Sequence, residues 1–580
     1  MVKKIILGIG IAFLLGFCFT SYYLFNNAEK IANDVVRNEF IKKYNESNSS
    51  QYEISIGTIK LNIFTGSFKL RDIVVTPKDS LIVLEKNLDG KAISNTYFKI
   101  SISEIKLSGF DIIDAINNRY VNANVFEVNS PKVDIYHYSE NPEIEKQPQD
   151  TLDLRTIFLT NYDSFNLDEL YLHDIHASIH VINARNDTSK LFSIHNLDQK
   201  VYSVKADRKS LFSDKLIEVG SYNINSKNIE VDLGQKATIE LSSLHFNSDE
   251  KDLLIKNFSF LPNSKPSDFL QSLKYKKGWV NFKAKEISIS NIDIIHWYQA
   301  QELFANSIKV IEPQINVFNK VSVPFDPKEN KPMLRELILA IPIPVKIESA
   351  RIENAKINID IDGKTAKNHG KLHFQSMNIE ASNITNIPEQ ISKNGKMTAH
   401  INTKINKTGN INAYINIDLS NKQGVTMFNV QASKIELPKF NSVLKPILRI
   451  SLTSGEMVSL KINSTISNNG AFGTMDAHYT KLKLQLESKD LEKKPGFFNN
   501  VASGIANGIL KTENNPESPD YHQGKFRFKR TQHDNFFKML WLVTMHGLED
   551  SILGSNSKEE KQKRKKEKKS KPKKKIFNFK

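Results

Sequence analysis

Three histidines form the densest group of potential metal ligands in the sequence: His173, His176 and His180. On a helix this spacing would gather the three imidazoles on one side, and such a set can bind Zn²⁺. The residues from Ile175 to Val181 alternate between apolar and polar types, however, which predicts a strand. Only His176 and His180 then share a face, and that face is polar. We therefore interpret the three as solvated strand histidines and assign no metal ligand.

Other residues with catalytic potential occur singly. His369 and His373 stand on either side of Gly370 and are interpreted in the same way. Asp111 and Asp293 each precede a predicted short helix, so we interpret them as helix caps rather than as paired acids. The sequence has no serine-centred elbow, phosphate-binding glycine loop, dinucleotide fingerprint or His-Glu-x-x-His motif. We expect no enzymatic activity and no cofactor, with a metal-dependent hydrolase as the least favoured alternative.

The charge is concentrated at one end of the chain. The 580 residues carry 80 Lys+Arg and 64 Asp+Glu, a net charge of +16. From Lys558 to Lys580 there are 13 Lys/Arg and 3 Glu, so this tail contributes +10 and the remaining chain is nearly balanced. The tail has no aromatic residue before Phe577. We expect it to bind anionic lipid or lipopolysaccharide weakly and in a salt-sensitive way, and we expect no nucleic acid partner.

The N-terminal segment predicts a membrane anchor. Ile5 to Phe25 is 21 residues long without a charge and would span roughly 31 Å as a helix. Lys3 and Lys4 precede it, which predicts a cytoplasmic N-terminus and an exported remainder. The alternative is a cleaved signal peptide, but the apolar run is longer than usual and no small-residue cleavage site follows. Cys18, the only cysteine, lies inside this segment, so the exported part has no disulfide.

The body of the chain predicts a β protein. Apolar and polar residues alternate in many segments between residues 51 and 490, most clearly from Ile411 to Leu419. Alternation with one polar face is typical of antiparallel sheets. Five short helices are predicted after the anchor and its stalk, at 112–120, 294–305, 442–448, 497–510 and 536–548. They are too few to cover the apolar face, which must close on another sheet or curl into a trough, and periodicity alone favours the closed core.

An internal repeat is the most specific feature of the sequence. Glu104–Tyr136 aligns without a gap on Glu286–Phe318, an offset of 182, with ten identities in 33 positions. Leu170–Val181 matches Ala350–Ile361 at an offset of 180, and Ile56–Pro77 matches Leu241–Pro262 at 185. We therefore predict two copies of a β unit, followed by a further β region. A tandem repeat of this kind predicts an elongated architecture in which each copy extends one sheet.

The order of these segments resembles the AsmA-like family of envelope proteins. An N-terminal anchor followed by Ile54–Pro77 is similar to the start of these proteins, and Phe440–Leu486 and Gly524–Leu548 are similar to the closing region of bacterial members. The family is similar to the bridge-like lipid-transfer proteins, which have a repeating β-groove. The resemblance implies an inner-membrane anchor, a periplasmic body and a groove whose apolar surface carries lipid tails. This chain is shorter than the larger members and has a lysine-rich tail.

The predicted protein is mainly β: an elongated, curled antiparallel sheet in the form of a groove, built from tandem repeats, with a few short helices and one transmembrane helix. The predicted segments are a cytoplasmic N-terminus (1–4), the transmembrane helix (5–25), a helical stalk (26–50), two β-groove repeats (51–235 and 236–395), a C-terminal β region (396–495), a helical or interfacial segment (496–555) and a basic disordered tail (556–580).

The expected function is that of a single-pass inner-membrane protein that binds or conducts phospholipid or another lipid and supports outer-membrane homeostasis, with a further envelope protein as partner of the C-terminal region. The alternative is a structural or assembly factor of the envelope that transports nothing. The residues predicted to line the groove are Ile357, Ile359, Ile361, Ile401, Ile405, Ile411, Ile415, Ile417 and Leu419. The residues predicted to contact a membrane surface are Phe536, Phe537, Leu540 and Trp541; an equally favoured role for their helix is to close the end of the sheet.

Overall fold

The computed structural model describes most of the body of the chain. The described residues are 37, 41–46, 52–62, 65–78, 96–111, 114, 118–138, 163–182, 187–207, 218–233, 236–293, 302–362, 369–486 and 510–554. The predicted transmembrane segment, most of the stalk and the basic tail lie outside these ranges. Among the described residues, no helix is long and apolar enough to cross a membrane.

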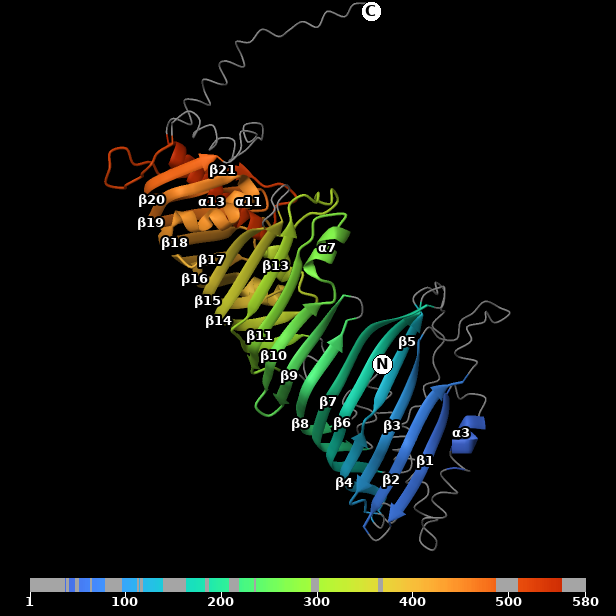
Figure 1. The fold of residues 1–580 in the computed structure, drawn as a ribbon. Coiled ribbons are helices and arrows are strands. Elements are labelled where there is room, and N and C mark those ends of the chain that lie inside the picture. The colour runs from blue at the N-terminus through green and yellow to red at the C-terminus, as the bar shows by residue number, and fades with distance from the viewer. Residues whose placement is uncertain are drawn as a thin grey trace, which may run out of the picture. The chain divides into compact units, whose positions relative to one another are not determined.

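The described chain is mainly β with a few short helices, as predicted, and it divides into two compact units, residues 1–263 and 264–580 (Figure 1). In the first unit a short helix, α3 (Lys42–Glu46), precedes ten strands. These strands are β1 (Tyr52–Asn62), β2 (Ser67–Pro77), β3 (Thr96–Ser108), β4 (Tyr120–Asn129), β5 (Lys132–Tyr138), β6 (Ser164–Ile182), β7 (Thr188–Asp207), β8 (Glu218–Asp232), β9 (Ala237–Asn247) and β10 (Asp252–Pro262).

The second unit contains the remaining elements. Its strands are β11 (Trp279–Ser290), β12 (Leu303–Ile311), β13 (Gln314–Lys320), β14 (Val345–Asp362), β15 (Gly370–Thr385), β16 (Lys396–Ile405), β17 (Gly409–Asp418), β18 (Thr426–Glu436), β19 (Ile450–Ser467), β20 (Gly470–Leu486) and β21 (Gly524–Lys529). Its helices are α7 (Pro266–Ser272), α9 (Leu334–Leu339), α10 (Pro388–Lys393), η3 (Leu437–Phe440), α11 (Asn441–Leu448) and α13 (Phe536–Leu553).

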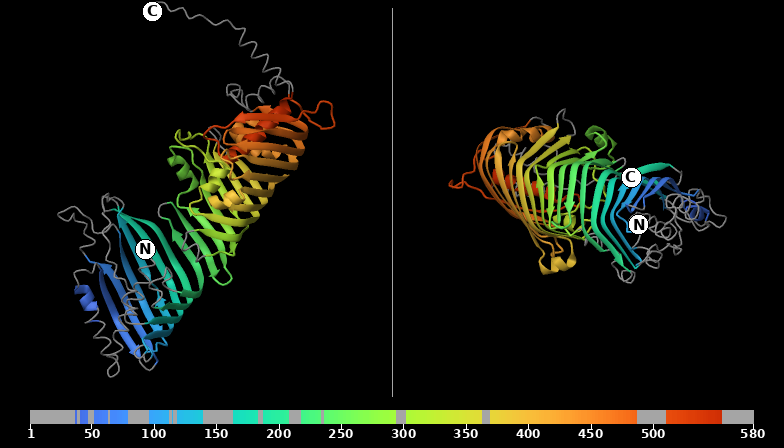
Figure 2. Two further views of the ribbon diagram at one scale, coloured as in Figure 1. Left: turned by 180° about the vertical axis from the view of Figure 1, so that it is seen from behind. Right: turned by 90° about the horizontal axis from the view of Figure 1, so that it is seen from below.

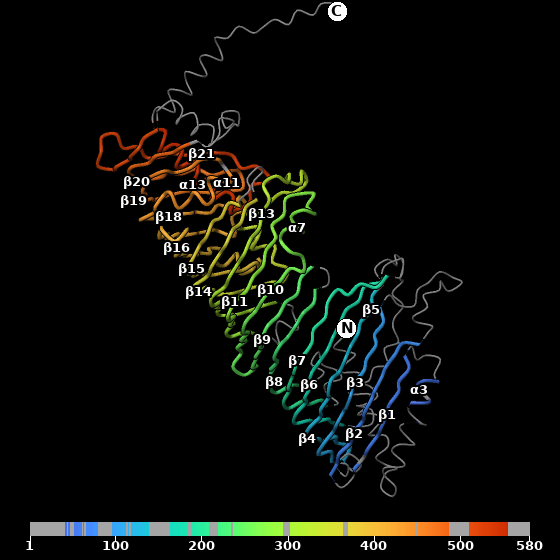
Figure 3. The backbone as a smooth tube through the Cα atoms, in the orientation of Figure 1, coloured from blue at the N-terminus to red at the C-terminus, as the bar shows by residue number. Residues whose placement is uncertain are grey.

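Strand pairing repeats between the units. β3 pairs antiparallel with both β4 and β5, and these two strands both run parallel to β6. In the second unit β11, β12, β13 and β14 pair in the same way. The internal repeat is therefore a repeat of topology, and Figure 3 traces the backbone of these strands within each unit.

The parallel pairs correct the prediction of a purely antiparallel sheet. Two short strands in succession, separated by a break such as Ser130-Pro131, run in one direction along β6. In the second unit the long connection of residues 321–344 supplies the crossover that the parallel pair of β13 and β14 requires. Alternation of apolar and polar residues reports one polar face, and a mixed sheet with one polar face gives the same pattern.

Bulges with left-handed backbone bend the strands. Asp72 and Asn257 have positive φ at an offset of 185, and Asp174 and Asn354 (φ 53° and 54°) do so at 180. Asx residues tolerate this conformation better than other residues with a Cβ atom. Strand register shifts around the bulge in β6 and around the one in β14. Figure 2 shows the consequence within each unit, where the strands bend so that the sheet has a concave side.

The bend carries its own hydrogen bonds. Asp198 accepts the backbone N–H of Asp174 through Oδ1 at 2.8 Å. Asn378 accepts the N–H of Asn354 through Oδ1 at 3.0 Å, which is the same bond in the second copy. Each bond satisfies a donor that the bulge removes from the strand ladder.

Two predicted helices are confirmed and two are wrong at their ends. α11 matches the predicted helix 442–448, and α13 matches the predicted 536–548 but extends to Leu553. Leu303–Ala305, predicted as the end of a helix, belongs to β12 because it pairs with β14, and Tyr120 belongs to β4 for the same reason. Of the helix predicted at 112–120, Asp114 is helical and its carbonyl accepts the N–H of Asn118 at 2.9 Å. Most other residues of the helices predicted at 112–120 and 294–305, and nearly all of 497–510, fall outside the described residues.

Candidate functional site

The concave face of the second unit carries an unbroken apolar row, here called the unit 2 row. Residues directly opposite each other in neighbouring strands share a face of the sheet, so the register identifies the members. They are Ile287, Val310, Ile352, Ile379, Ile401, Ala413, Val430, Ile462 and Met475, from β11, β12 and β14 to β20. Each of these nine strands contributes one aliphatic or sulfur-containing side chain.

The first unit also has an apolar row across nine strands, the unit 1 row, which runs through different repeat positions from the unit 2 row. Its members are Ile54, Val75, Ile100, Val133, Ala177, Ile194, Val231, Ile239 and Phe260. Val75, Ile100 and Val133 are buried in the core of that unit, whereas the members from β6 to β10 are half-buried. Both units thus have a continuous apolar line on one face.

Exposure changes along the unit 2 row. The members from β11 to β16 are half-buried, and those from β17 onward are buried. Ala413 retains 5% of its exposed area, Ile462 1% and Met475 none. Part of the row therefore forms an accessible apolar surface and the rest forms a closed core.

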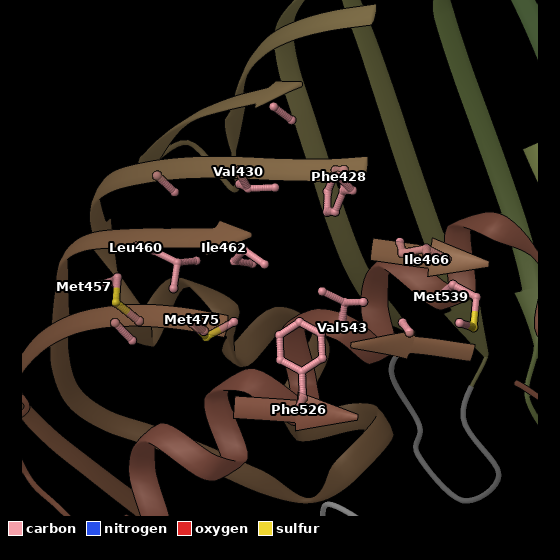
Figure 4. Packing of buried hydrophobic residues seen from close by; sticks show 14 of the residues in the cluster. Phe428, Val430, Met457, Leu460, Ile462, Ile466, Met475, Phe526, Met539 and Val543 are labelled. Atoms are coloured by element: carbon pink, nitrogen blue, oxygen red, sulfur yellow. The ribbon is translucent and has the colours of Figure 1, made fainter. Parts of the chain in front are cut away.

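Helix α13 closes the C-terminal part of the row. Its residues Phe536, Met539 and Val543 recur at helical spacing and are buried against β19, β20 and β21. Figure 4 shows Met539 and Val543 among the strand residues of this cluster. Asn535 caps the helix, with its Oδ1 accepting the N–H of Lys538 at 2.8 Å.

Close packing of this helix depends on two glycines: a Cβ atom at Gly524 of β21 would lie 2.5 Å from the carbonyl oxygen of Gly547 in the helix. A Cβ atom at Gly547 would lie 2.5 Å from Cε of Met475, the last member of the row. The two glycines let the helix approach the sheet closely at this point.

The predicted lining residues of β14 lie on the accessible part of the face. Ile357, Ile359 and Ile361 are half-buried and belong to no buried cluster. Ile357 is in register with Ile315 of β13 and Phe374 of β15, which makes a second, shorter apolar line beside the unit 2 row.

The predicted lining residues of β16 and β17 are more covered. Ile401 and Ile411 are half-buried against the cluster that α13 closes, and Ile405 is buried. Ile415 is buried in that same cluster. Ile417 and Leu419 are fully buried, in a cluster with Ile338 of α9. The prediction that these residues line an open groove is therefore corrected for four buried side chains: Ile405, Ile415, Ile417 and Leu419.

The four predicted membrane-contact residues divide into two pairs. Phe536 is buried in the core and Leu540 packs against it. Phe537 is 68% exposed and Trp541 37% exposed, four residues apart on the outer side of α13. The helix therefore closes the sheet with one side and presents two aromatic rings with the other.

The histidines lie on the outer face of β6. Because the bulge at Asp174 shifts the alternation, His173 shares this face with His176 and His180, so the prediction that only the last two share a face is wrong. His173 stacks on Tyr171, and His180 on Tyr136.

Local hydrogen bonds occupy both ring nitrogens of His176. Its Nδ1 lies 2.8 Å from Nδ1 of His195, and its Nε2 lies 2.9 Å from Oδ1 of Asp174. The two partners are on opposite sides of the ring and share no point where an ion could sit. No group of three or more potential metal ligands gathers within the described parts of the chain.

The other chemically notable residues have structural partners. Nδ1 of His373 lies 2.8 Å from Oδ1 of Asn358, and Oδ1 of Asp111 accepts the N–H of Asp114 at 2.9 Å, as a helix cap does. On the outer face, hydrogen bonds from Tyr171 and Lys200 lower the pKa of the Glu169 carboxyl.

No protein-family model matches the sequence, and the search of curated proteins found no match. The function of this protein is therefore inferred from the arrangement of its own residues. The row itself was not predicted from the sequence, although two of its members, Ile287 and Val310, are identical to Ile105 and Val128 in the repeat alignment.

Proposed function

We propose that this protein binds lipid tails along its apolar rows and, anchored in the inner membrane through residues 5–25, conducts phospholipid through the periplasm toward the outer membrane. The observation that carries the proposal is the unit 2 row, which is unbroken over nine strands and half-exposed in its first five. A polar residue anywhere in the row would interrupt the path of an acyl chain, and none is present.

The dimensions of the row suit an acyl chain. Strands in a sheet are ~4.8 Å apart, so nine strands extend for roughly 40 Å. One leaflet contributes about half of the ~30 Å hydrocarbon thickness of a bilayer, so an extended tail fits along the accessible part of the row. Such binding needs no covalent chemistry. The resemblance of the chain to AsmA-like proteins supports the same proposal.

Site-specific photo-crosslinking tests it. A photoreactive phenylalanine analogue is placed at Ile352, in the accessible part of the row, and in a matched variant at Arg351. Arg351 is the preceding residue of β14, lies on the opposite face and is exposed. Cells labelled with radioactive phosphate are irradiated, and the purified protein is examined for bound label and for the mass of the adduct.

We expect a phospholipid adduct at position 352 and little or none at position 351. Equal labelling at the two positions would show that the lipid is merely the surrounding membrane, and absence of label at 352 would contradict lipid binding.

A structural role in the envelope is the second candidate, favoured by the closed core around α13. In that case the folded protein has no lipid adduct at either position, and the exposed Phe537 and Trp541 contact a partner instead.

A further inference from the structure

Two segments distant in sequence are fastened together in the second unit, near the start of α13. The backbone N–H of Lys331 donates to the carbonyl of Gln532 at 2.7 Å, and Nε2 of Gln532 donates to the carbonyl of Pro327 at 2.9 Å. The backbone N–H of Lys276, from the segment before β11, donates to the carbonyl of Pro324 at 2.8 Å. These three hydrogen bonds hold together the segments that contain Lys276, residues 324–331 and Gln532, and so position their side chains.

Phe325 lies where these segments meet and contacts side chains from the other two. The ring of His533 stacks on it, with 4.9 Å between centroids and 6° between planes. Nζ of Lys276 lies 4.9 Å from the same centroid, and Nζ of Lys538 lies 5.2 Å from it. Two ammonium groups are thus attracted to one ring. We call Phe325, Lys276, Lys331, His533 and Lys538 the Phe325 cluster.

Positive charge at the cluster is only partly balanced. Lys538 pairs with Asp534 at 2.5 Å, and Lys331 pairs with Glu329 at 2.5 Å. Lys276 has no ion pair with any described carboxylate. Burial and then the like charges of Lys538 and Lys331 lower its pKa.

A polar atom in the cluster also lacks a partner. Nδ1 of His533 is buried and has no hydrogen bond in the described structure. Leaving such a buried atom unpaired destabilises the protein relative to pairing it. A group that accepts a hydrogen bond and carries negative charge would satisfy both His533 and Lys276.

We propose that the Phe325 cluster binds a phosphate-type oxyanion, with Lys276 as its main charged contact and His533 as a hydrogen-bond donor. Lysine binds phosphate as a point charge and does not need the planar geometry of a carboxylate–arginine pair. The anion is either free phosphate or the headgroup phosphate of a lipid. The second source rests on the proposed function; the binding site itself does not.

The test uses the full chain in a neutral detergent and isothermal titration with inorganic phosphate. The variant is Lys276→Gln, which removes the charge and keeps a shorter polar side chain. The control is Lys277→Gln, which removes a charge from the neighbouring, exposed position. We expect K276Q to weaken phosphate binding at least about tenfold and K277Q to change it by less than about twofold. Thermal unfolding should show that K276Q is no less stable than the native chain.

The inference is overturned if the native chain binds no phosphate, or if K276Q and K277Q weaken binding equally, since that would be a general charge effect. A second titration with dihexanoyl phosphatidic acid, below its micellar concentration, identifies the source. Competition with phosphate in the native chain but not in K276Q assigns the site to a lipid headgroup. Binding of phosphate without competition assigns it to the free ion, and the inference then stands even if crosslinking at position 352 fails.

Discussion

A charge placed at two points of the unit 2 row should have two different effects. Ile352 and Ile462 lie in the same row, but the first is half-buried and the second is 1% exposed. We predict that Ile462→Glu unfolds the second unit, whereas Ile352→Glu leaves it folded and removes lipid binding.

The magnitudes follow from burial. Replacing Ile462 removes about 1.5–3 kcal/mol of apolar burial and places a carboxylate in a closed core, which costs several kcal/mol more. Together these approach the ~5–15 kcal/mol that stabilises a typical domain. At position 352 the carboxylate reaches water, so only part of the burial is lost and we expect a cost of about 1–2 kcal/mol.

Urea unfolding followed by circular dichroism measures the first effect, and binding of a fluorescent phospholipid measures the second. Arg351→Glu, with the same new side chain on the opposite face, is the control: because it faces Glu380 it should cost less than about 1 kcal/mol, and it should keep lipid binding. The reasoning fails if Ile352→Glu destabilises the protein as much as Ile462→Glu, because the face at β14 would then be a closed core. Normal lipid binding by Ile352→Glu would refute the role of the row.

Three further predictions concern the bend and α13. At the bulge in β14, Asn354→Gly should be neutral and Asn354→Ala should cost about 1–2 kcal/mol in urea unfolding, because the left-handed backbone penalises a Cβ atom; equal stability of the two variants would exclude strain at this position. Met539→Ala should destabilise the second unit by about 2–5 kcal/mol and Phe537→Ala by less than about 0.5, since only the first is buried; similar costs would contradict the packing of α13. Burial opposes ionisation of Asp534, but hydrogen bonds from Lys538 and Thr531 outweigh it and lower its pKa. This contribution is present above the unfolded pKa of about 3.9 and is lost as pH falls through the native pKa, so native chain and Asp534→Asn should converge in melting temperature below about pH 4, and a constant gap would contradict the ion pair.

The strands, the internal repeat and two of the helices could be predicted from the sequence alone. Alternation from Ile411 to Leu419 identified β17 and its continuation, and helical spacing in 536–548 identified α13. Both patterns reflect local geometry, since a strand has a period of two and a helix one of 3.6. Such periods are visible in a single segment.

Contacts between segments that are distant in the sequence could not be predicted in the same way. The parallel pairing of β5 with β6 depends on where a connection crosses, and alternation does not record that. The burial of Ile417 and Leu419 depends on α9, which comes from a segment about 80 residues earlier. His173 was assigned to the wrong face because one bulge, at Asp174, shifts every later residue of the strand.

The identities of the internal repeat show which of these features the sequence must keep. Ile105/Ile287 and Val128/Val310 are identical, and in both copies the pair is in register on the inner face. Their outer-face neighbours differ, since Lys106 corresponds to Ser288 and Glu127 to Lys309.

The identical Pro131 and Pro313 mark the break between the two short strands in each copy, and the residue before each, Ser130 or Glu312, has left-handed backbone. The repeat thus preserves an apolar line and the backbone turns that position it, while the outer surface varies. Within each unit, every strand that keeps an apolar residue in register extends the line by one position, so the length of the line depends on register as well as on composition.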